Sequence, residues 1–147
     1  MATRYKFDQR HFIPRYEALD DPAAGVDLLY TNLEERILEL MHLSFRLVTS
    51  ATVATRVVRV TATNGSVVHA RAVGPNTQTA SQTAEYSFGV GNASLAIIGT
   101  ILNRTSPLRV GIIVTALTTV ETAIENIQAA DQVSAVSIYF KQWLSTL

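Results

Sequence analysis

Three histidines are the side chains of this sequence best suited to hold a metal ion or to transfer a proton near neutral pH. They are His11, His42 and His69, which lie far apart along the chain and form no H-x-H pair. A metal site carried by strands needs such a pair, a nearby carboxylate and a further histidine. His42 and His69 can contribute only if folding brings them face to face across a sheet. We therefore predict no metal ion and no other cofactor.

Paired carboxylates, which can divide acid and base roles in catalysis, occur at three places. Asp20-Asp21 and Glu34-Glu35 fall in segments that resemble linkers or turns, and Glu121 with Glu125 resembles the solvated side of a loop. Acidic residues in such segments are explained by solubility alone. The chain also has no cysteine, which excludes a thiolate nucleophile. We therefore predict that the protein is not an enzyme.

Three arginines, Arg56, Arg59 and Arg71, are expected to cluster on one face of a β-hairpin, where they can meet nucleic acid or an acidic partner. The formal net charge is zero, however, and a protein built to neutralise phosphates needs a large positive excess. We favour salt bridges to acidic residues of this chain or of a neighbour. The prediction is that no specific nucleic acid is bound.

Aromatic residues give a further set of candidates. Tyr139 and Trp143 lie on the same face of a predicted strand near the end of the sequence. Such a face can fill a pocket in a partner or stack on a sugar ring. It can also cover the protein's own sheet, with the N-terminal segment packed on it. These alternatives stay open at this point.

The N-terminal segment, residues 1–27, interleaves aromatic with basic residues, and its two prolines discourage a continuous helix. A disordered tail is one interpretation. Disordered segments are usually poor in aromatic residues, so we favour an extended arm that docks on its own domain or on a neighbour. With the C-terminal pair, the candidate interface residues are Tyr5, Phe7, Phe12, Tyr16, Tyr139 and Trp143.

Residues 28–147 are predicted to form one domain of short strands separated by turn signals. The clearest strand places Ile37, Met41 and Leu43 on one face, and Asn64-Gly65 predicts a type I′ hairpin turn. Residues 95–102 fit a strand or a short helix, and 121–130 fit a loop or one helical turn. With the clearest strand at 36–49 included, the predicted strands span residues 27–31, 36–49, 52–63, 66–73, 84–88, 108–119 and 133–143.

About eight strands with hardly any helix predict an all-β protein, a jelly-roll-like antiparallel β-sandwich with an extended N-terminal arm. Apolar residues make up 48% of the chain and charged residues 16%. A surface with so few charges is poorly protected from association. No stretch reaches the roughly 18 apolar residues of a membrane span, and the N-terminus lacks a signal-peptide core. We expect a protein made in the cytoplasm, with no membrane partner, that works bound to other proteins.

Three stretches of the domain carry distinctive motifs. They are T-S-A-T-V-A-T-R at 49–56 with V-H-A-R at 68–71, Q-T-A-S-Q-T-A-E-Y-S-F at 78–88, and I-Q-A-A-D-Q-V-S-A-V at 127–136. Together they resemble a group of small structural proteins of tailed bacteriophages, over roughly residues 28–143 with gaps. Residues 33–35 depart from the Pro-Ala-Gly step of that group, and residues 1–27 have no counterpart in it. The motifs describe strand edges and turns and contain no catalytic residue.

The resemblance implies a protein of the virion, and small β-sandwiches of that kind commonly decorate or cement capsids. It therefore points to a capsid decoration protein that binds the major capsid protein or other virion proteins as a homo-oligomer, with a trimer favoured. An arm that reaches across a neighbour would suit this role. A position in the neck, tail or baseplate is one alternative. A carbohydrate-binding module that uses Tyr139 and Trp143 is another.

Overall fold

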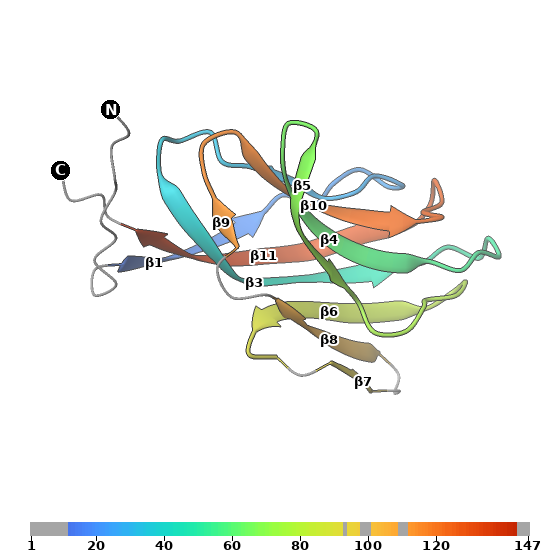
Figure 1. The fold of residues 1–147 in the computed structure, drawn as a ribbon. Coiled ribbons are helices and arrows are strands. Elements are labelled where there is room, and N and C mark those ends of the chain that lie inside the picture. The colour runs from blue at the N-terminus through green and yellow to red at the C-terminus, as the bar shows by residue number, and fades with distance from the viewer. Residues whose placement is uncertain (1–11, 93, 98–100, 109–111, 144–147) are drawn as a thin grey trace, which may run out of the picture.

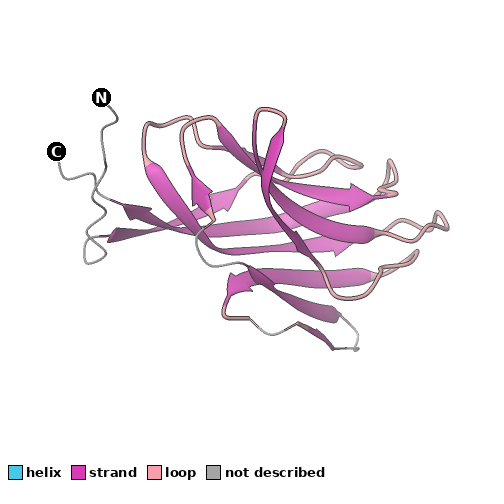
Figure 2. Cartoon of the chain, viewed as in Figure 1, coloured by secondary structure: helices cyan, strands magenta, loops and turns pink. Residues whose placement is uncertain are grey.

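The computed structural model describes residues 12–92, 94–97, 101–108 and 112–143, which form eleven strands in two sheets (Figure 1). No helix occurs within these ranges (Figure 2). The predicted all-β class is therefore confirmed, whereas the predicted count of about eight strands is too low. None of the helices that a membrane span would require is present in the described ranges.

The larger sheet has seven strands, in the order β1-β11-β3-β6-β8-β7 with β9 beside β3. All of its pairs are antiparallel except β6 with β8, which is parallel. The predicted jelly roll, which is antiparallel throughout, is therefore not confirmed. The strands are β1 (Phe12–Leu19), β3 (Ile37–Val48), β6 (Thr83–Val90), β7 (Leu95–Ile97), β8 (Leu102–Leu108), β9 (Ile113–Val114) and β11 (Gln132–Trp143).

The smaller sheet is antiparallel and has the order β2-β10-β4-β5. Its inner face packs on the larger sheet, and side chains of both sheets join in one apolar core. Alternation along the strands supplies this core, because every second residue points inward. The strands are β2 (Leu29–Thr31), β4 (Val57–Asn64), β5 (Val67–Val73) and β10 (Thr118–Glu125).

A β-bulge in β3 changes which residues face the core. Leu38, Leu40 and Leu43 are all buried, so the inward face shifts by one residue between Leu40 and Leu43. The register with β11 shifts at the same point, and Met41 is the extra residue. The prediction that Ile37 and Met41 share the inward face with Leu43 is therefore wrong, because a bulge resets the two-residue period.

The hairpin turn between β4 and β5 differs by one residue from its prediction. β4 continues through Asn64, so the two turn residues are Gly65 and Ser66. Of these, Gly65 alone has a positive φ, +60°. A positive φ at the first central position is typical of a type II′ turn, which accommodates glycine there. The predicted type I′ turn is wrong.

The region from residue 108 to 130 differs most from its prediction. Of the expected strand at 108–119, residues 109–111 lie outside the described residues, and the rest contains the end of β8, the two-residue β9 and the start of β10. The expected loop or helical turn at 121–130 contains most of β10. Thr118, Val120 and Thr122 all face the interior of the sandwich. The Thr122 hydroxyl accepts a hydrogen bond from the Leu28 amide and donates one to Asp27. Threonine is therefore tolerated in this core because its hydroxyl is bonded.

The predicted arm contributes a strand to the same fold. β1 pairs with β11 along its whole length, from Phe12 opposite Trp143 to Leu19 opposite Val136. Residues 12–19 are thus extended and docked on their own chain, and the predicted division between 27 and 28 runs within one folded unit. Gly25 then fixes the connection to β2: its φ is +74°, and a Cβ there would lie 2.7 Å from the Ala129 backbone.

Candidate functional site

Four of the six candidate interface residues meet on the outer face of the larger sheet, where β1 lies beside β11. The rings of Tyr16 and Tyr139 are stacked with centroids 4.3 Å apart and planes 9° apart. The rings of Phe12 and Trp143 meet edge to face at 6.0 Å. Both pairs follow from the register, which sets each pair of residues directly opposite one another. Tyr5 and Phe7 lie outside the described residues.

The two aromatic pairs differ in what they present to solvent. The Phe12 ring already has the Lys141 ammonium 5.0 Å from its centroid, on top of its contact with Trp143. Tyr16 is 74% exposed and rests on Tyr139. Burial raises the pKa of Tyr139, and the charge and hydrogen bond of the Tyr16 phenol raise it further. Tyr139 is therefore neutral at physiological pH, and Tyr16 presents an aromatic ring that is held in place.

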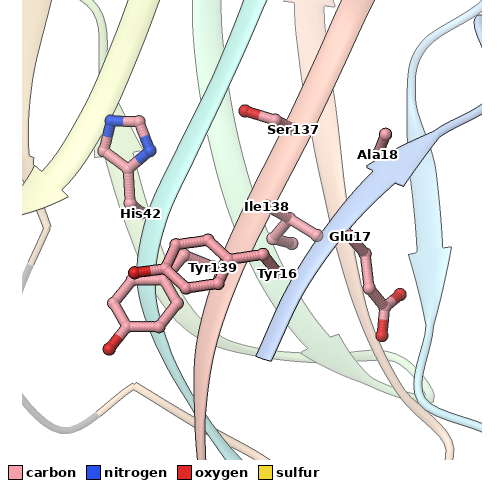
Figure 3. Close-up of a pocket in the computed structure, with 7 residues that line it drawn as sticks. All are labelled: Tyr16, Glu17, Ala18, His42, Ser137, Ile138 and Tyr139. Atoms are coloured by element: carbon pink, nitrogen blue, oxygen red, sulfur yellow. The ribbon is translucent and has the colours of Figure 1, made fainter. Parts of the chain in front are cut away.

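A hollow of about 420 Å³ opens beside this stacked pair. Figure 3 shows the two rings overlapping, with His42 on β3 and Ser137 on β11 close by and Glu17 pointing away. The residues that line the hollow are Tyr16, Glu17, Ala18, His42, Ser137, Ile138 and Tyr139. The hollow thus has aromatic rings on one side and small or polar residues on the other.

Hydroxyl and imidazole groups continue along the same face. His42 Nε2 lies 2.8 Å from Ser87 Oγ, and Ser44 Oγ lies 2.8 Å from Ser137 Oγ. Burial lowers the pKa of His42, so its ring is neutral near physiological pH and can both donate and accept hydrogen bonds. Each serine hydroxyl has one donor and two acceptor sites, more than these single contacts use. The face can therefore bind a ligand that itself donates and accepts.

A second exposed feature is β5, the edge strand of the smaller sheet. Val67 and Val68 are 58% and 47% exposed, and Val73 is exposed as well. His69 forms a bulge in the pairing with β4, and Arg71 is solvent-exposed. An edge strand offers unpaired backbone groups to another chain. β5 thus combines an edge position with exposed apolar side chains, and at its end the Val73 carbonyl accepts a hydrogen bond from the Ser106 hydroxyl of β8 at 2.6 Å.

A buried ion pair lies at one end of the sandwich. Arg56 and Asp131 are both 0% exposed, and two arginine nitrogens donate to the two carboxylate oxygens at 2.9 Å. The guanidinium also donates to the carbonyls of Thr52 and Ala54, at 3.1 and 2.8 Å. Asp131 accepts further bonds from the Ser50 amide and hydroxyl and the Gln128 amide. The pair thus joins two loops that lie far apart in sequence.

The pKa of Asp131 reflects this surplus of donors. Burial alone would raise the pKa, but the bonds from Arg56, Ser50 and Gln128 outweigh it and lower the pKa to about 2. No buried side-chain nitrogen or oxygen is left without a partner in the described part of the chain. This network is saturated, so we interpret it as structural.

The motifs of the sequence converge on this network. Thr49 and Arg56 come from the first motif, Gln78 and Tyr86 from the second and Asp131 from the third. Gln78 is fully buried and donates to the Leu47 carbonyl at 3.0 Å, while the Tyr86 hydroxyl donates to Gln78. Sequence reasoning assigned these residues to turns and strand edges and did not find their common site. The only signal was the presence of polar residues in the steps between apolar strands.

The other candidates for chemistry are separated or engaged. His42 lies on β3 of the larger sheet and His69 on β5 of the smaller one, and His11 lies outside the described residues. Within the described ranges no group of three metal-binding side chains comes together. Glu125 pairs with Arg59 at 2.7 Å and Asp131 pairs with Arg56, so two of the three candidate arginines form salt bridges within the chain. The predicted cluster of all three on one face of the hairpin is wrong, because Arg56 lies before β4 and is fully buried.

Two of the remaining acidic candidates, Glu34 and Glu121, also have partners. Glu34 Oε2 lies 2.8 Å from Arg36 Nε and 3.1 Å from Arg15 Nη1. Glu121 accepts a bond from the Thr61 hydroxyl at 3.2 Å. These carboxylates hold neighbouring strands together, which is a structural use. In comparisons with protein-family models, curated proteins and solved structures, no match to this chain is found.

Proposed function

We propose that this chain is a structural protein of a bacteriophage virion, a capsid decoration or cement protein that binds the major capsid protein as a homo-oligomer, with a trimer favoured. The motifs at 49–56, 78–88 and 127–136 support the class, through their resemblance to virion proteins. The observation that carries the assembly role is the exposed apolar edge strand β5, at Val67 and Val68.

The other described edge strands are poorly suited to pairing with another chain. β1 contains Pro14, which has no amide hydrogen to donate. β2 and β7 have three residues each. β5 has seven residues, no proline, no lysine and no acidic residue. Lysine, proline and acidic residues protect many natural edge strands from pairing with another chain, and β5 has none of them. Its protection is limited to the exposed Arg71 and the bulge at His69.

Binding to an assembled lattice explains why such an edge would be kept. A protein that binds only the assembled shell shifts the equilibrium toward that shell, and several linked copies add avidity. A net charge of zero also leaves little repulsion between copies. A place in the neck, tail or baseplate uses the same edge and remains the alternative position within the virion.

Immunogold electron microscopy tests the class and the position. An antibody raised against the purified chain is applied to particles from a lysate of the source. Label spread over the heads is expected for decoration. Label confined to one vertex or to the tail contradicts decoration and favours the alternative position. Unlabelled particles contradict the virion proposal as a whole.

A charged substitution tests the role of β5. We expect Val68→Lys to lower the oligomer mass, measured by sedimentation across a concentration series, and to weaken binding to particles at least tenfold. Val53→Lys is the matched control, because Val53 is 94% exposed in the loop before β4. Unchanged mass and binding in Val68→Lys would place the interface elsewhere.

A terminal deletion tests the arm. Residues 12–19 belong to the larger sheet, so a deletion that reaches them removes a strand as well as the arm. Removing residues 1–11 alone is the cleaner experiment. The arm hypothesis expects weaker binding to particles with the thermal midpoint unchanged, and equal binding would contradict it.

A further inference from the structure

The outer face of the larger sheet carries a separate proposal, independent of the edge of β5. We propose that the hollow beside Tyr16 and Tyr139 binds a carbohydrate, with one pyranose ring stacked on the Tyr16 ring. Its volume of about 420 Å³ lies within the range of small-molecule pockets, about 300–1,000 Å³.

The Tyr16 ring, stacked on Tyr139, offers a flat platform for a sugar. A pyranose has an apolar face of C–H groups, which packs on an aromatic ring, and an edge of hydroxyls. Tyr16 is 74% exposed, yet its ring is stacked at 4.3 Å on Tyr139, which restrains it before any ligand arrives. A restrained platform loses less conformational entropy on binding than a free side chain does. Trp143 meets Phe12 instead, so the exposed ring is Tyr16.

The polar lining of the hollow also suits a sugar. Sugar hydroxyls both donate and accept, and the serine hydroxyls and neutral imidazole on this face have the same property. Ser137 and His42 line the hollow directly. Ser44 and Ser87 stand behind them, bonded to Ser137 and His42 at 2.8 Å. These contacts orient the two lining groups while leaving acceptor sites open.

The charge of the lining bears on the kind of ligand. Flat rings are also bound by single-stranded nucleic acids, whose bases stack on aromatic side chains and whose phosphates need cations. None of the seven residues that line the hollow is lysine or arginine. The Glu17 carboxylate points away from the hollow (Figure 3) and pairs with Arg15. Arg46, on the same face, is paired with Glu85 at 2.6 Å. The lining therefore favours a neutral sugar over a polyanion.

The experiment measures binding of the purified full chain to cello-, malto-, chito- and mannohexaose by isothermal titration calorimetry. At least one of these probes is expected to bind. Tyr16→Ala is expected to raise its Kd at least about tenfold, and Tyr16→Phe to leave it within about threefold, because the ring is kept. Val53→Ala, an exposed apolar truncation far along the chain, is the matched control.

Each outcome decides the proposal. Binding that is lost in Tyr16→Ala and kept in Tyr16→Phe and Val53→Ala supports it, with thermal unfolding used to show that Tyr16→Ala is fully folded at the temperature of the titration. Absence of binding to all four probes overturns it, and so does binding that is indifferent to Tyr16→Ala. Tighter, Tyr16-dependent binding of a thymidine oligonucleotide would assign the face to nucleic acid and also overturn it. The oligomer mass is unaffected by Tyr16→Ala if the β5 proposal holds, so the two proposals fail separately.

Discussion

The buried network around Arg56 and Asp131 and the outer face around Tyr16 and Tyr139 use similar polar groups in opposite ways. In the network each charge meets several partners and both side chains are fully buried. On the outer face His42 bonds Ser87, Ser44 bonds Ser137, Ser87 also accepts a bond from Asn92, and the Tyr16 ring is 74% exposed. The strongest pKa shift of the described residues thus marks a structural element. The outer face can bind a ligand because its hydroxyl and imidazole groups still have unused hydrogen-bonding sites.

The largest expected difference between the two regions is the effect of removing an arginine. Arg56→Ala leaves the Asp131 carboxylate buried without its partner, and we expect a loss of about 3–5 kcal/mol in the free energy of unfolding. Arg46→Ala is the control on the outer face, where the pair with Glu85 is exposed and contributes at most about 1 kcal/mol. Urea denaturation measures both. Similar losses in the two variants would remove the distinction.

Acid should weaken the network next. The folded pKa of Asp131, about 2, lies below its ordinary value of 3.8, so the unfolded chain binds this proton more readily. The stability from Asp131 is complete above about pH 5 and is lost as the pH falls toward about 2, a change of roughly 2 kcal/mol. Urea unfolding across this range measures it. In Asp131→Asn that part of the pH dependence should disappear, and an unchanged slope would contradict the assignment.

Matched removal of a hydroxyl sharpens the comparison further. Thr49 Oγ1 donates to the Thr79 carbonyl at 2.6 Å and accepts from the Gln82 amide at 3.0 Å, in the buried region. Thr49→Val should therefore cost about 1–3 kcal/mol. Ser44→Ala, on the outer face, should stay within about 0.5 kcal/mol because water replaces the lost bond. Thermal or urea unfolding of the two variants decides it, and a larger loss in Ser44→Ala would reverse the contrast.

The smallest effect concerns the stacked tyrosines. A double-mutant cycle with Tyr16→Ala and Tyr139→Ala should give a coupling of about 0.5–1.5 kcal/mol, typical of an aromatic pair on facing strands. The cycle is read from urea unfolding of the four proteins. A coupling near zero would mean that Tyr139 does not hold Tyr16 in place, which would weaken the platform argument.

Local patterns predicted the elements whose pairing is local. The hairpin of β4 and β5 and the strands β3, β6 and β11 lie within or close to their predicted ranges, because alternation and turn residues are read from neighbours in sequence. β10 was missed because its buried threonines resemble surface residues in the sequence. Their burial is explained only by tertiary hydrogen bonds, such as those of Thr122 with Leu28 and Asp27. The bulge at Met41 appears in the sequence only as a change of phase, because Leu38 and Leu40 alternate out of step with Leu43, Phe45 and Leu47, and its position is fixed by the pairing with β11.

The sites depend on contacts that sequence reasoning could not place. Arg56 and Asp131 are 75 residues apart in the sequence, and the residues around each of them do not indicate which partner it binds. Sequence reasoning named six aromatic candidates, yet the pairing of Tyr16 with Tyr139 is set by the register of β1 on β11 and could not be read from either residue. The carbohydrate-binding alternative placed Tyr139 and Trp143 on one face of a strand. It did not include Tyr16, because Tyr16 comes from the other end of the chain.

The position of β11 has a consequence for how the protein is made. It lies between β1 and β3 in the larger sheet, although it follows the other ten strands along the chain (Figure 1). Among the described strands, β1 pairs only with β11. During synthesis β1 therefore has no strand to pair with until residues 132–143 have left the ribosome. Closing so long a loop is slow, and strand edges stay open meanwhile. A ribosome that stalls before residue 132 would release a chain without β11, in which β1 cannot be joined to β3 in the larger sheet. Such a chain should depend on chaperones.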